Sequence, residues 1–201
     1  MAERAHPKHF NWFRKSRLFG IIPFISFNPY RKALFWRYKI ANKYCDGKIV
    51  LDVPCGMGWG TSLLKRARHI TGVDISKEAI IEAKKLYPVV ASFQVGSMDL
   101  LDFKNKSFDV VVCLEGIEHV SEQVGDKFLN ECKRVLKNGG LLILSSPYPV
   151  KGSHSGNPYH IKEYTVEEIE EKLTSANFKI LSKESRQVSE IIITIFISQL
   201  S

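Results

Sequence analysis

Short apolar runs alternate along the chain with longer stretches in which apolar residues recur every three or four positions. The short runs predict buried strands, and the longer stretches predict helices. Strands are expected at 48–53, 69–74, 90–95, 108–113 and 141–146, and helices at 58–67, 76–86, 122–137 and 165–176. Because strands and helices alternate, the pattern favours an α/β fold whose parallel sheet carries helices on both faces.

The two ends of the chain extend this pattern. Residues 179–185 and 190–198 predict two strands joined as a hairpin. The second of them is apolar on both faces, as in a strand inside a sheet. Periodicity alone would also allow a helix there, and the β-branched residues favour the strand. Before the first strand, the spacing of Leu34, Tyr38 and Ala41 predicts a helix over 30–43 that packs on the domain.

A glycine-rich bend follows the first strand, which ends on Asp52. Glycines at 56, 58 and 60 let the backbone approach a nucleotide-like ligand at the carboxyl edge of a parallel sheet, where a Cβ would block it. The next strand ends on Asp74, where a carboxylate can accept two hydrogen bonds from ribose hydroxyls. The alternative is that Asp74 caps the helix that begins near Ser76.

Two ligand classes use this arrangement, dinucleotides and S-adenosylmethionine. A dinucleotide site places its pyrophosphate on a helix N-terminus behind a third glycine, and the chain has Thr61 at that position. Asp52 would also repel a pyrophosphate, whereas it would attract an α-amino group or a sulfonium. The negative charge of Asp52 therefore favours S-adenosylmethionine over a nicotinamide cofactor.

Five segments in this order carry a family resemblance: 50–58, 72–76, 96–99, 108–120 and 134–144. With them, the chain from about Lys48 to Thr165 resembles the class I S-adenosylmethionine-dependent methyltransferases. The resemblance implies a Rossmann-like, seven-stranded, mostly parallel sheet with an antiparallel last strand. It also implies a methyltransferase domain over 45–201, with S-adenosyl-L-methionine as cofactor and S-adenosyl-L-homocysteine as product.

The resemblance also assigns roles around the methionine part of the cofactor. Gly56 and Gly58 would line it, and Asp52 would help to hold its amino group through water or backbone. Glu115, at the end of the fourth strand, would lie near the same amino group. Pro54 departs from the family, which has glycine or alanine there. Because proline lacks an N–H, a bend that used this amide is excluded.

At the adenosine end, the resemblance implies that Asp74 binds the ribose hydroxyls and that Ile75 lies against the adenine face. Asp99 would accept a hydrogen bond from the adenine amino group, and the backbone of Met98 would contact the edge of the adenine ring.

Methyl transfer to a hydroxyl requires removal of its proton, and histidine is the natural general base. His119 follows the fourth strand and His160 follows the fifth, both at the active edge. For His119 the alternative is orientation of its loop, and for His160 a local hydrogen bond. The loop-like segment 148–164 is expected to form one wall of the substrate pocket. Together with the glycine bend it resembles a branch that modifies glycans and secondary metabolites.

The expected acceptor is therefore an oxygen of a small molecule or glycan. A membrane-associated quinone or lipid is the alternative acceptor. A module that binds the cofactor without transferring its methyl group is a further alternative.

The net charge of +8 is concentrated in the first 44 residues, a basic and aromatic segment with ten Lys and Arg against one acid. Residues 45–201 carry nineteen against twenty, so charge gives no support to nucleic-acid binding by the domain. Segment 1–44 is interpreted as a lid over the cofactor mouth, with membrane-surface contact through residues 1–30, RNA contact or a targeting peptide as alternatives.

The length of 201 residues favours one domain, and no apolar run is long enough to span a bilayer. The four cysteines, at 45, 55, 113 and 132, lack Cys-x-x-Cys spacing. They are interpreted as reduced, buried residues of an intracellular protein, and no metal site is expected from them. We therefore expect a cytoplasmic protein, with peripheral contact at the inner membrane surface under the lipid alternative.

Overall fold

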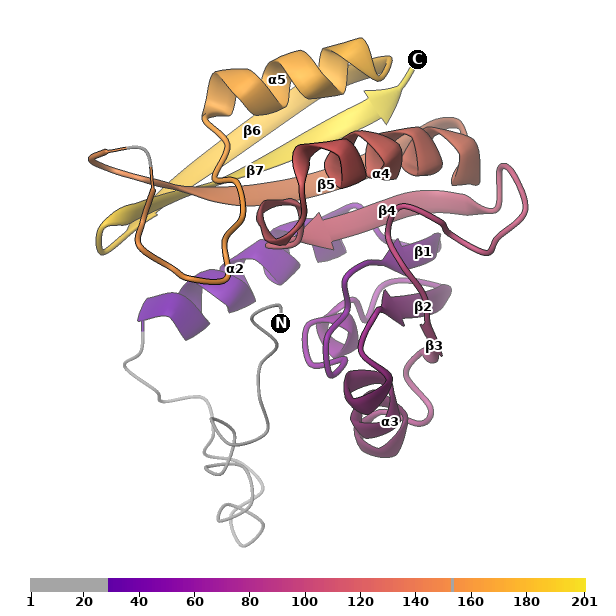
Figure 1. Ribbon diagram of the computed structural model, residues 1–201. Coiled ribbons are helices and arrows are strands. Elements are labelled where there is room, and N and C mark those ends of the chain that lie inside the picture. Colours follow the sequence, from indigo (N-terminus) through magenta and orange to yellow (C-terminus); the bar gives the residue numbers. More distant parts are fainter. Residues whose placement is uncertain (1–28, 153) are drawn as a thin grey trace, which may run out of the picture.

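The computed structural model describes residues 29–152 and 154–201, and the labels below follow Figure 1. Helices are α2 (Pro29–Lys43), α3 (Lys77–Leu86), α4 (Glu122–Val135) and α5 (Val166–Ser175), with short 3-10 turns η2 (Thr61–Leu63) and η3 (Ile117–His119). Strands are β1 (Ile49–Asp52), β2 (His69–Asp74), β3 (Ser92–Val95), β4 (Phe108–Leu114), β5 (Leu136–Pro149), β6 (Phe178–Val188) and β7 (Ile191–Leu200).

The strands form one seven-stranded sheet in the order β3-β2-β1-β4-β5-β7-β6. Strands β1 to β5 pair in parallel, and β7 is antiparallel to both of its neighbours, β5 and β6. This confirms the expected fold class. The strand order reverses between β1 and β4, and in open parallel sheets ligands bind at the carboxyl ends of the strands beside such a point.

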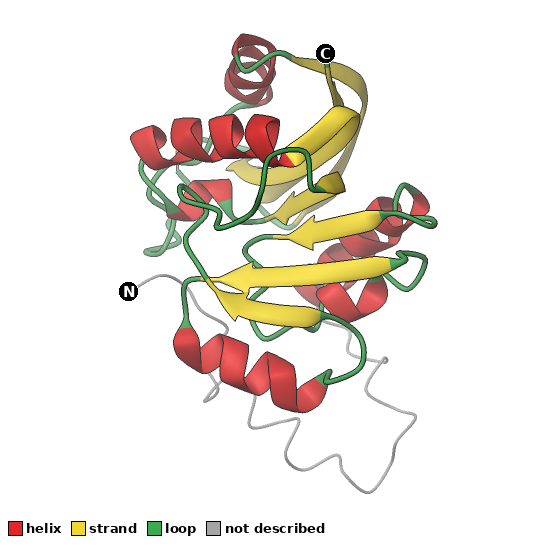
Figure 2. Cartoon of the chain, turned by 90° about the vertical axis from the view of Figure 1, so that its right-hand side faces the viewer, coloured by secondary structure: helices red, strands yellow, loops and turns green. Residues whose placement is uncertain are grey.

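Helices cover both faces of the sheet, as the sequence pattern predicts. Figure 1 shows α4 and α5 on one side of the strands and α2 on the other, and Figure 2 shows helices on both sides of the twisted sheet. Successive side chains of a strand point to opposite faces. On β4, Val110 and Val112 therefore join the apolar cluster with α2, whereas Val111 and Cys113 join the cluster with α4.

The helix expected at 58–67 is wrong, because only the 3-10 turn η2 forms there. Two features of the sequence explain this. Gly58 adopts φ of 77°, which is left-handed and cannot continue into a helix. The segment left after Gly60 is short, and a short helix gains few hydrogen bonds for the cost of its first turn.

The boundary between α4 and β5 also differs from the expectation. The helix ends at Val135, two residues early, because Leu136 already pairs with Phe108 of β4. At its other end β5 continues to Pro149, since Pro149 pairs with Ile191 of β7. The irregular segment expected from residue 148 therefore begins after Pro149.

The helix expected over 30–43 is confirmed as α2. Its buried residues Ala33, Tyr38 and Ala41 pack on the sheet, so this part of the basic segment belongs to the packing of the domain. The lid role expected of segment 1–44 and the membrane contact expected of residues 1–30 rest mainly on residues 1–28, which lie outside the described residues. Among the described helices, none is long and apolar enough to cross a membrane.

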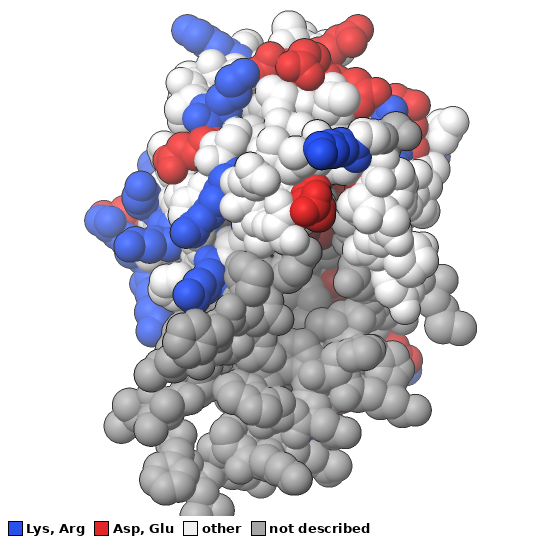
Figure 3. Space-filling view, turned by 90° about the vertical axis from the view of Figure 1, so that its left-hand side faces the viewer, with Lys and Arg blue, Asp and Glu red and all other residues white. Residues whose placement is uncertain are grey.

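The surface on the side toward which β4 points carries both signs of charge. Figure 3 views the molecule from this side and shows, outside the grey atoms, Lys and Arg along one flank and acidic side chains along the top. This mixed pattern differs from the continuous basic stripe typical of nucleic-acid-binding domains. The four cysteines are buried and unpaired, as expected.

Candidate active site

A cleft of about 1350 Å³ lies at the carboxyl ends of β1, β2 and β4, where the strand order reverses. The segments that follow these strands line it, and so does the turn after β3. The helix α2 and the loop between β5 and α5 contribute further walls through Trp36, Arg37, Asn157 and His160. The cleft is larger than a typical small-molecule pocket, so it has room for a cofactor and an acceptor together.

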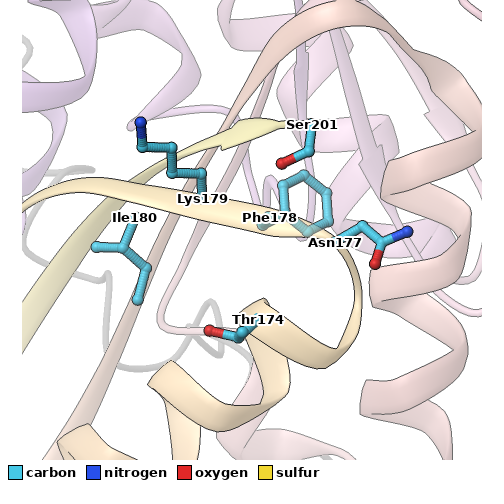
Figure 4. A pocket seen from close by; sticks show the side chains of 6 residues that line it. All are labelled: Thr174, Asn177, Phe178, Lys179, Ile180 and Ser201. Carbon is cyan, nitrogen blue, oxygen red and sulfur yellow. The ribbon is translucent and has the colours of Figure 1, made fainter.

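A second hollow, of about 500 Å³, lies at the opposite edge of the sheet (Figure 4). It is lined by Thr174, Asn177, Phe178, Lys179, Ile180 and Ser201. No histidine, cysteine or acidic side chain is among these residues, so this hollow lacks the groups typical of acid–base or metal chemistry.

Asp74 joins the end of β2 to the bend after β1. Its Oδ2 accepts a hydrogen bond from the Gly56 amide at 2.9 Å, and its Oδ1 accepts one from the Ser76 amide at 2.8 Å. Ser76, not Asp74, caps α3, because its Oγ accepts from the Ala79 amide. Both Asp74 and Gly56 line the cleft, and each carboxylate oxygen keeps acceptor capacity for a ligand hydroxyl.

Gly58 lies behind the cleft wall rather than on it. A Cβ at this position would come within 2.8 Å of the Phe93 ring and 3.1 Å of the Ala83 side chain. The absence of a side chain therefore lets the bend pack closely on α3 and β3, which fixes the course of the backbone toward Gly56.

Asp52 is fully buried between the bend and α2, and it is not among the cleft-lining residues. Thr61 Oγ1 donates to its Oδ2 at 2.6 Å, and the Tyr38 hydroxyl lies 3.3 Å from both carboxylate oxygens. Burial raises the pKa of Asp52 to about 7, against the opposing effect of these two hydrogen bonds. The carboxylate therefore anchors the bend to α2 from behind.

Glu115 and Arg37 form a charged pair on the cleft wall. Glu115 adopts φ of 57°, which is uncommon for a residue other than glycine. Its Oε1 accepts from Ser145 Oγ at 3.0 Å, and its Oε2 lies 3.6 Å from Arg37 Nη1. The buried Arg37 has an Nε without a hydrogen-bond partner in the described chain. Arg37 was not predicted as a site residue, because one arginine in an amphipathic helix gives no local signal of a site.

The turn after β3 and the end of β2 form the opposite wall. Ile75 lines the cleft and is 60% exposed, which leaves an apolar side chain uncovered there. Met98 also lines the cleft, whereas Asp99 accepts a hydrogen bond from Ser97 Oγ and is not among the lining residues. Of the predicted cofactor residues, the structure thus places Gly56, Asp74, Ile75, Met98 and Glu115 on the cleft, whereas Asp52, Gly58 and Asp99 are not among the residues that line it.

His119 and His160, 41 residues apart in sequence, lie together, with their rings edge to face at 4.9 Å between centroids. His119 Nδ1 lies 3.0 Å from the Tyr159 carbonyl, so this nitrogen is the donor. His160 Nδ1 contacts the Glu163 carboxylate, while its Nε2 lies 2.9 Å from Asn157 Nδ2. Each ring thus carries its proton on Nδ1 and its lone pair on Nε2.

Glu118, which was not predicted as a site residue, completes this cluster. It is fully buried yet lines the cleft, and neither carboxylate oxygen has a hydrogen-bond partner in the described part of the chain. Burial, and then the nearby Glu115, raise its pKa well above the usual range. The signal in the sequence was Glu118's position beside His119 and three residues after Glu115, directly beyond a strand.

The loop from 150 to 165 is tied to this cluster through the backbone. The amides of Ile161 and Lys162 donate to the Glu118 carbonyl at 2.8 and 3.2 Å. These bonds hold His160 beside His119. Among the aromatic side chains near this loop and the glycine bend, Trp59 lines the cleft, whereas Tyr164 is 1% exposed and belongs to the core.

Comparison with known proteins agrees with this geometry. Residues 51–144, from β1 to β5, match the family model described as methyltransferase domain. The chain is 33% identical over 141 residues to a probable S-adenosylmethionine-dependent methyltransferase of Mycolicibacterium smegmatis, covering 68% of this chain and 54% of that protein. The chain belongs to the class I S-adenosylmethionine-dependent methyltransferases. The cofactor of this family is S-adenosylmethionine.

Two further comparisons concern chemistry and fold. A ubiquinone biosynthesis O-methyltransferase of Alkalilimnicola ehrlichii is 34% identical over 106 residues, covering 50% of this chain and 42% of that protein. The crystal structure of the cyclase SpnF matches with a TM-score of 0.73 and 19% identity, covering 84% and 82% of the two chains, which shows the fold alone. The chain spans about half the length of the curated relatives it matches.

Burial of Asp52 predicts a pH-dependent stability. Its pKa is raised from 3.8 to about 7 in the folded chain. Between these values the unfolded chain ionises this carboxyl and the folded chain keeps it neutral, so the Asp52 contribution to stability falls as pH rises from about 4 to about 7. The full effect is at most about 4 kcal/mol.

Urea unfolding of Asp52→Asn between pH 4 and 8 measures this effect. The free energy of unfolding of the variant should rise relative to the unsubstituted chain as pH increases, whereas the exposed Asp102→Asn should follow the unsubstituted chain. A difference between Asp52→Asn and the unsubstituted chain that stays constant with pH would contradict the raised pKa.

Proposed function

We propose that this chain transfers a methyl group from S-adenosylmethionine to an oxygen atom of a small-molecule or glycan acceptor. One observation carries the proposal: a single cleft joins the glycine bend and Asp74, at one end, to the histidine pair at the other. The first set of groups suits an adenosyl cofactor, and the second suits a hydroxyl that must lose a proton.

The adenosine part would lie along the wall formed by β2 and the turn after β3. Asp74 would accept hydrogen bonds from the ribose hydroxyls, using the acceptor capacity left by Gly56 and Ser76. The exposed Ile75 would cover the adenine face. The Met98 backbone would contact the edge of the adenine ring. The neighbouring Asp99 would accept a hydrogen bond from the adenine amino group after local adjustment of its bond to Ser97.

The methionine part carries both an amino group and a carboxylate, and the opposite wall carries both complementary charges. Glu115 would attract the amino group, and Arg37, whose Nε lacks a partner in the described chain, would bind the carboxylate. Gly56 lines the same stretch of the cleft. Asp52 and Gly58 would act from behind, by holding the bend in place.

The cofactor supplies an electrophilic methyl group, so the protein contributes alignment and exclusion of water. The acceptor oxygen forms its bond to the methyl carbon as the carbon–sulfur bond breaks, and S-adenosylhomocysteine leaves. We infer that His119 and His160 assist the removal of the acceptor proton. Their Nε2 lone pairs and their position on the cleft suit this role.

Replacement of Asp74 tests the cofactor assignment. Asp74→Ala should bind S-adenosylhomocysteine about 100-fold more weakly, because two hydrogen bonds to a charged acceptor are lost. Isothermal titration calorimetry measures the affinity, and circular dichroism checks that the variant folds. Asp74→Asn serves as a second variant of nearly the same shape, and the exposed Asp102→Ala is the matched control. Unchanged affinity in both Asp74 variants would refute the ribose assignment.

Replacement of the histidines tests the acceptor end. A panel of hydroxyl acceptors with methyl-labelled cofactor first identifies a substrate. His119→Ala and His160→Ala should then lower kcat about 100-fold or more, with cofactor affinity unchanged, because proton removal and not binding is impaired. The control is His69→Ala, an exposed residue at the start of β2 on the opposite edge. Full turnover in both variants would exclude a role in proton removal.

A quinone or lipid acceptor is the second candidate. Relatives named for ubiquinone biosynthesis and for 2-methyl-6-phytyl-1,4-hydroquinone methylation favour it. The cleft wall from α2 is also partly apolar, through Leu34, Phe35 and Trp36. Such an acceptor would suit a cytoplasmic enzyme that contacts the inner membrane surface through residues 1–30, whereas a lid role for this segment needs no membrane.

Vesicle flotation distinguishes these alternatives. With a membrane-contacting segment, the full chain should float with anionic vesicles and less with neutral ones, and a chain without residues 1–30 should stay at the bottom. Equal behaviour of the two chains would exclude this contact and leave the soluble acceptor.

A further inference from the structure

Glu118, His119 and His160 bring three potential metal-ligand atoms within 4.8 Å of one another. They come from two elements. The turn η3 supplies Glu118 and His119, and the loop between β5 and α5 supplies His160. The hydrogen bonds from Ile161 and Lys162 to the Glu118 carbonyl hold these two elements together. The cluster is therefore set by the fold and not by one flexible segment.

The burial of Glu118 is the independent sign of a ligand. Its side chain is fully buried, it lines the cleft, and both carboxylate oxygens lack a hydrogen-bond partner in the described chain. A buried polar group without a partner is costly, so native structures nearly always satisfy it with protein, water or a ligand. Glu118 Oε1 lies 4.0 Å from His119 Nε2, which leaves a gap that a bound ion would bridge.

The surroundings of both histidines are those of metal ligands. A ligating histidine usually donates its second ring N–H to a carbonyl or carboxylate, which fixes the tautomer and the ring orientation. His119 does so to the Tyr159 carbonyl, and His160 does so to the Glu163 carboxylate. Asn157 Oδ1 accepts from the Tyr159 amide, so its Nδ2 faces His160 Nε2 as a donor and marks the lone pair there.

We propose that Glu118, His119 and His160 bind a divalent transition-metal cation such as Zn²⁺ at the acceptor end of the cleft. Two imidazoles and one carboxylate favour such ions over Mg²⁺ or Ca²⁺, which prefer all-oxygen sites. With metal–ligand bonds of about 2.1 Å, the ligand atoms of a bound ion lie roughly 3 to 4 Å apart. Side-chain rotations that move these atoms by about 1 Å would therefore close the site. His160 would exchange its contact with Asn157 for the ion.

No metal site was expected from the sequence, since the four cysteines lack the spacing of metal ligands. Three protein ligands leave a coordination position for an acceptor oxygen, as in catalytic zinc sites. The catalytic part of this inference rests on the proposed oxygen methylation. The bound hydroxyl would release its proton to water, because the cation lowers its pKa, and the oxygen would then take the methyl group. The histidines would assist proton removal as ligands and not as bases.

Calorimetric titration of the EDTA-stripped full chain with Zn²⁺ tests the binding, with Mn²⁺ and Mg²⁺ in parallel. Glu118→Gln and His160→Ala should weaken Zn²⁺ binding about 100-fold or more, and Glu163→Gln about tenfold through His160. His69→Asn and a chain with His6→Asn and His9→Asn should bind as the unsubstituted chain does. S-adenosylhomocysteine titration verifies that each variant is folded, and Glu118→Gln keeps the shape of the side chain.

Two results would overturn the site. One is no Zn²⁺ binding by the unsubstituted chain, and the other is Zn²⁺ binding by Glu118→Gln and His160→Ala that is as tight as binding by the unsubstituted chain. Tighter binding of Mg²⁺ than of Zn²⁺ would overturn the assigned ion class. The catalytic role is tested separately with an identified acceptor. Loss of turnover in EDTA and its return with Zn²⁺ would support it, whereas turnover unaffected by EDTA in a chain shown to bind Zn²⁺ would refute it. Because the Zn²⁺ titration needs no turnover, its outcome is independent of the proposed function.

Discussion

The hydrogen bond from the Gly56 amide to Asp74 joins the ends of two parallel strands, and the cofactor end of the cleft depends on it. Parallel pairing brings the carboxyl ends of β1 and β2 to one edge, but it does not set the course of the chain beyond them. That course is set from two sides. Asp74 holds the bend from the cleft, and Asp52 with Thr61 and Tyr38 holds it from the core. The backbone that faces the cofactor is therefore fixed before a ligand arrives, which lowers the cost of ordering it on binding.

Much of this end could be predicted from sequence because its determinants are local. Asp52 and Asp74 each end an apolar run, and parallel strands must place such ends together. The acceptor end was less predictable. That His119 and His160 lie at the same edge follows from the strand pattern, but their contact depends on a loop whose path is set by hydrogen bonds to the Glu118 carbonyl. Arg37 reaches the cleft only through the packing of α2, and no local pattern encodes that packing.

The helix expected at 58–67 does not form, and the reason is again tertiary packing that no local pattern encodes. The spacing of apolar residues there is compatible with a helix, but the bend must pack against Phe93 and Ala83 and present Thr61 to Asp52. These contacts use a left-handed Gly58 and only a single turn at η2. Local helical preference is weak, and such tertiary contacts override it. Local and global requirements therefore conflict at the cofactor bend, as expected where function constrains the backbone.

The two fully buried carboxylates, Asp52 and Glu118, show how burial separates support from chemistry. Both have raised pKa values for the same main reason, the loss of water. Asp52 recovers hydrogen bonds from Thr61 and Tyr38 within the fold, so its burial is explained by the structure that it holds together. The Glu118 carboxylate recovers no hydrogen bond in the described chain, although the backbone carbonyl of the same residue accepts two. A fold that satisfies the backbone of a residue and leaves its buried side chain open toward a cleft has placed that side chain for a ligand.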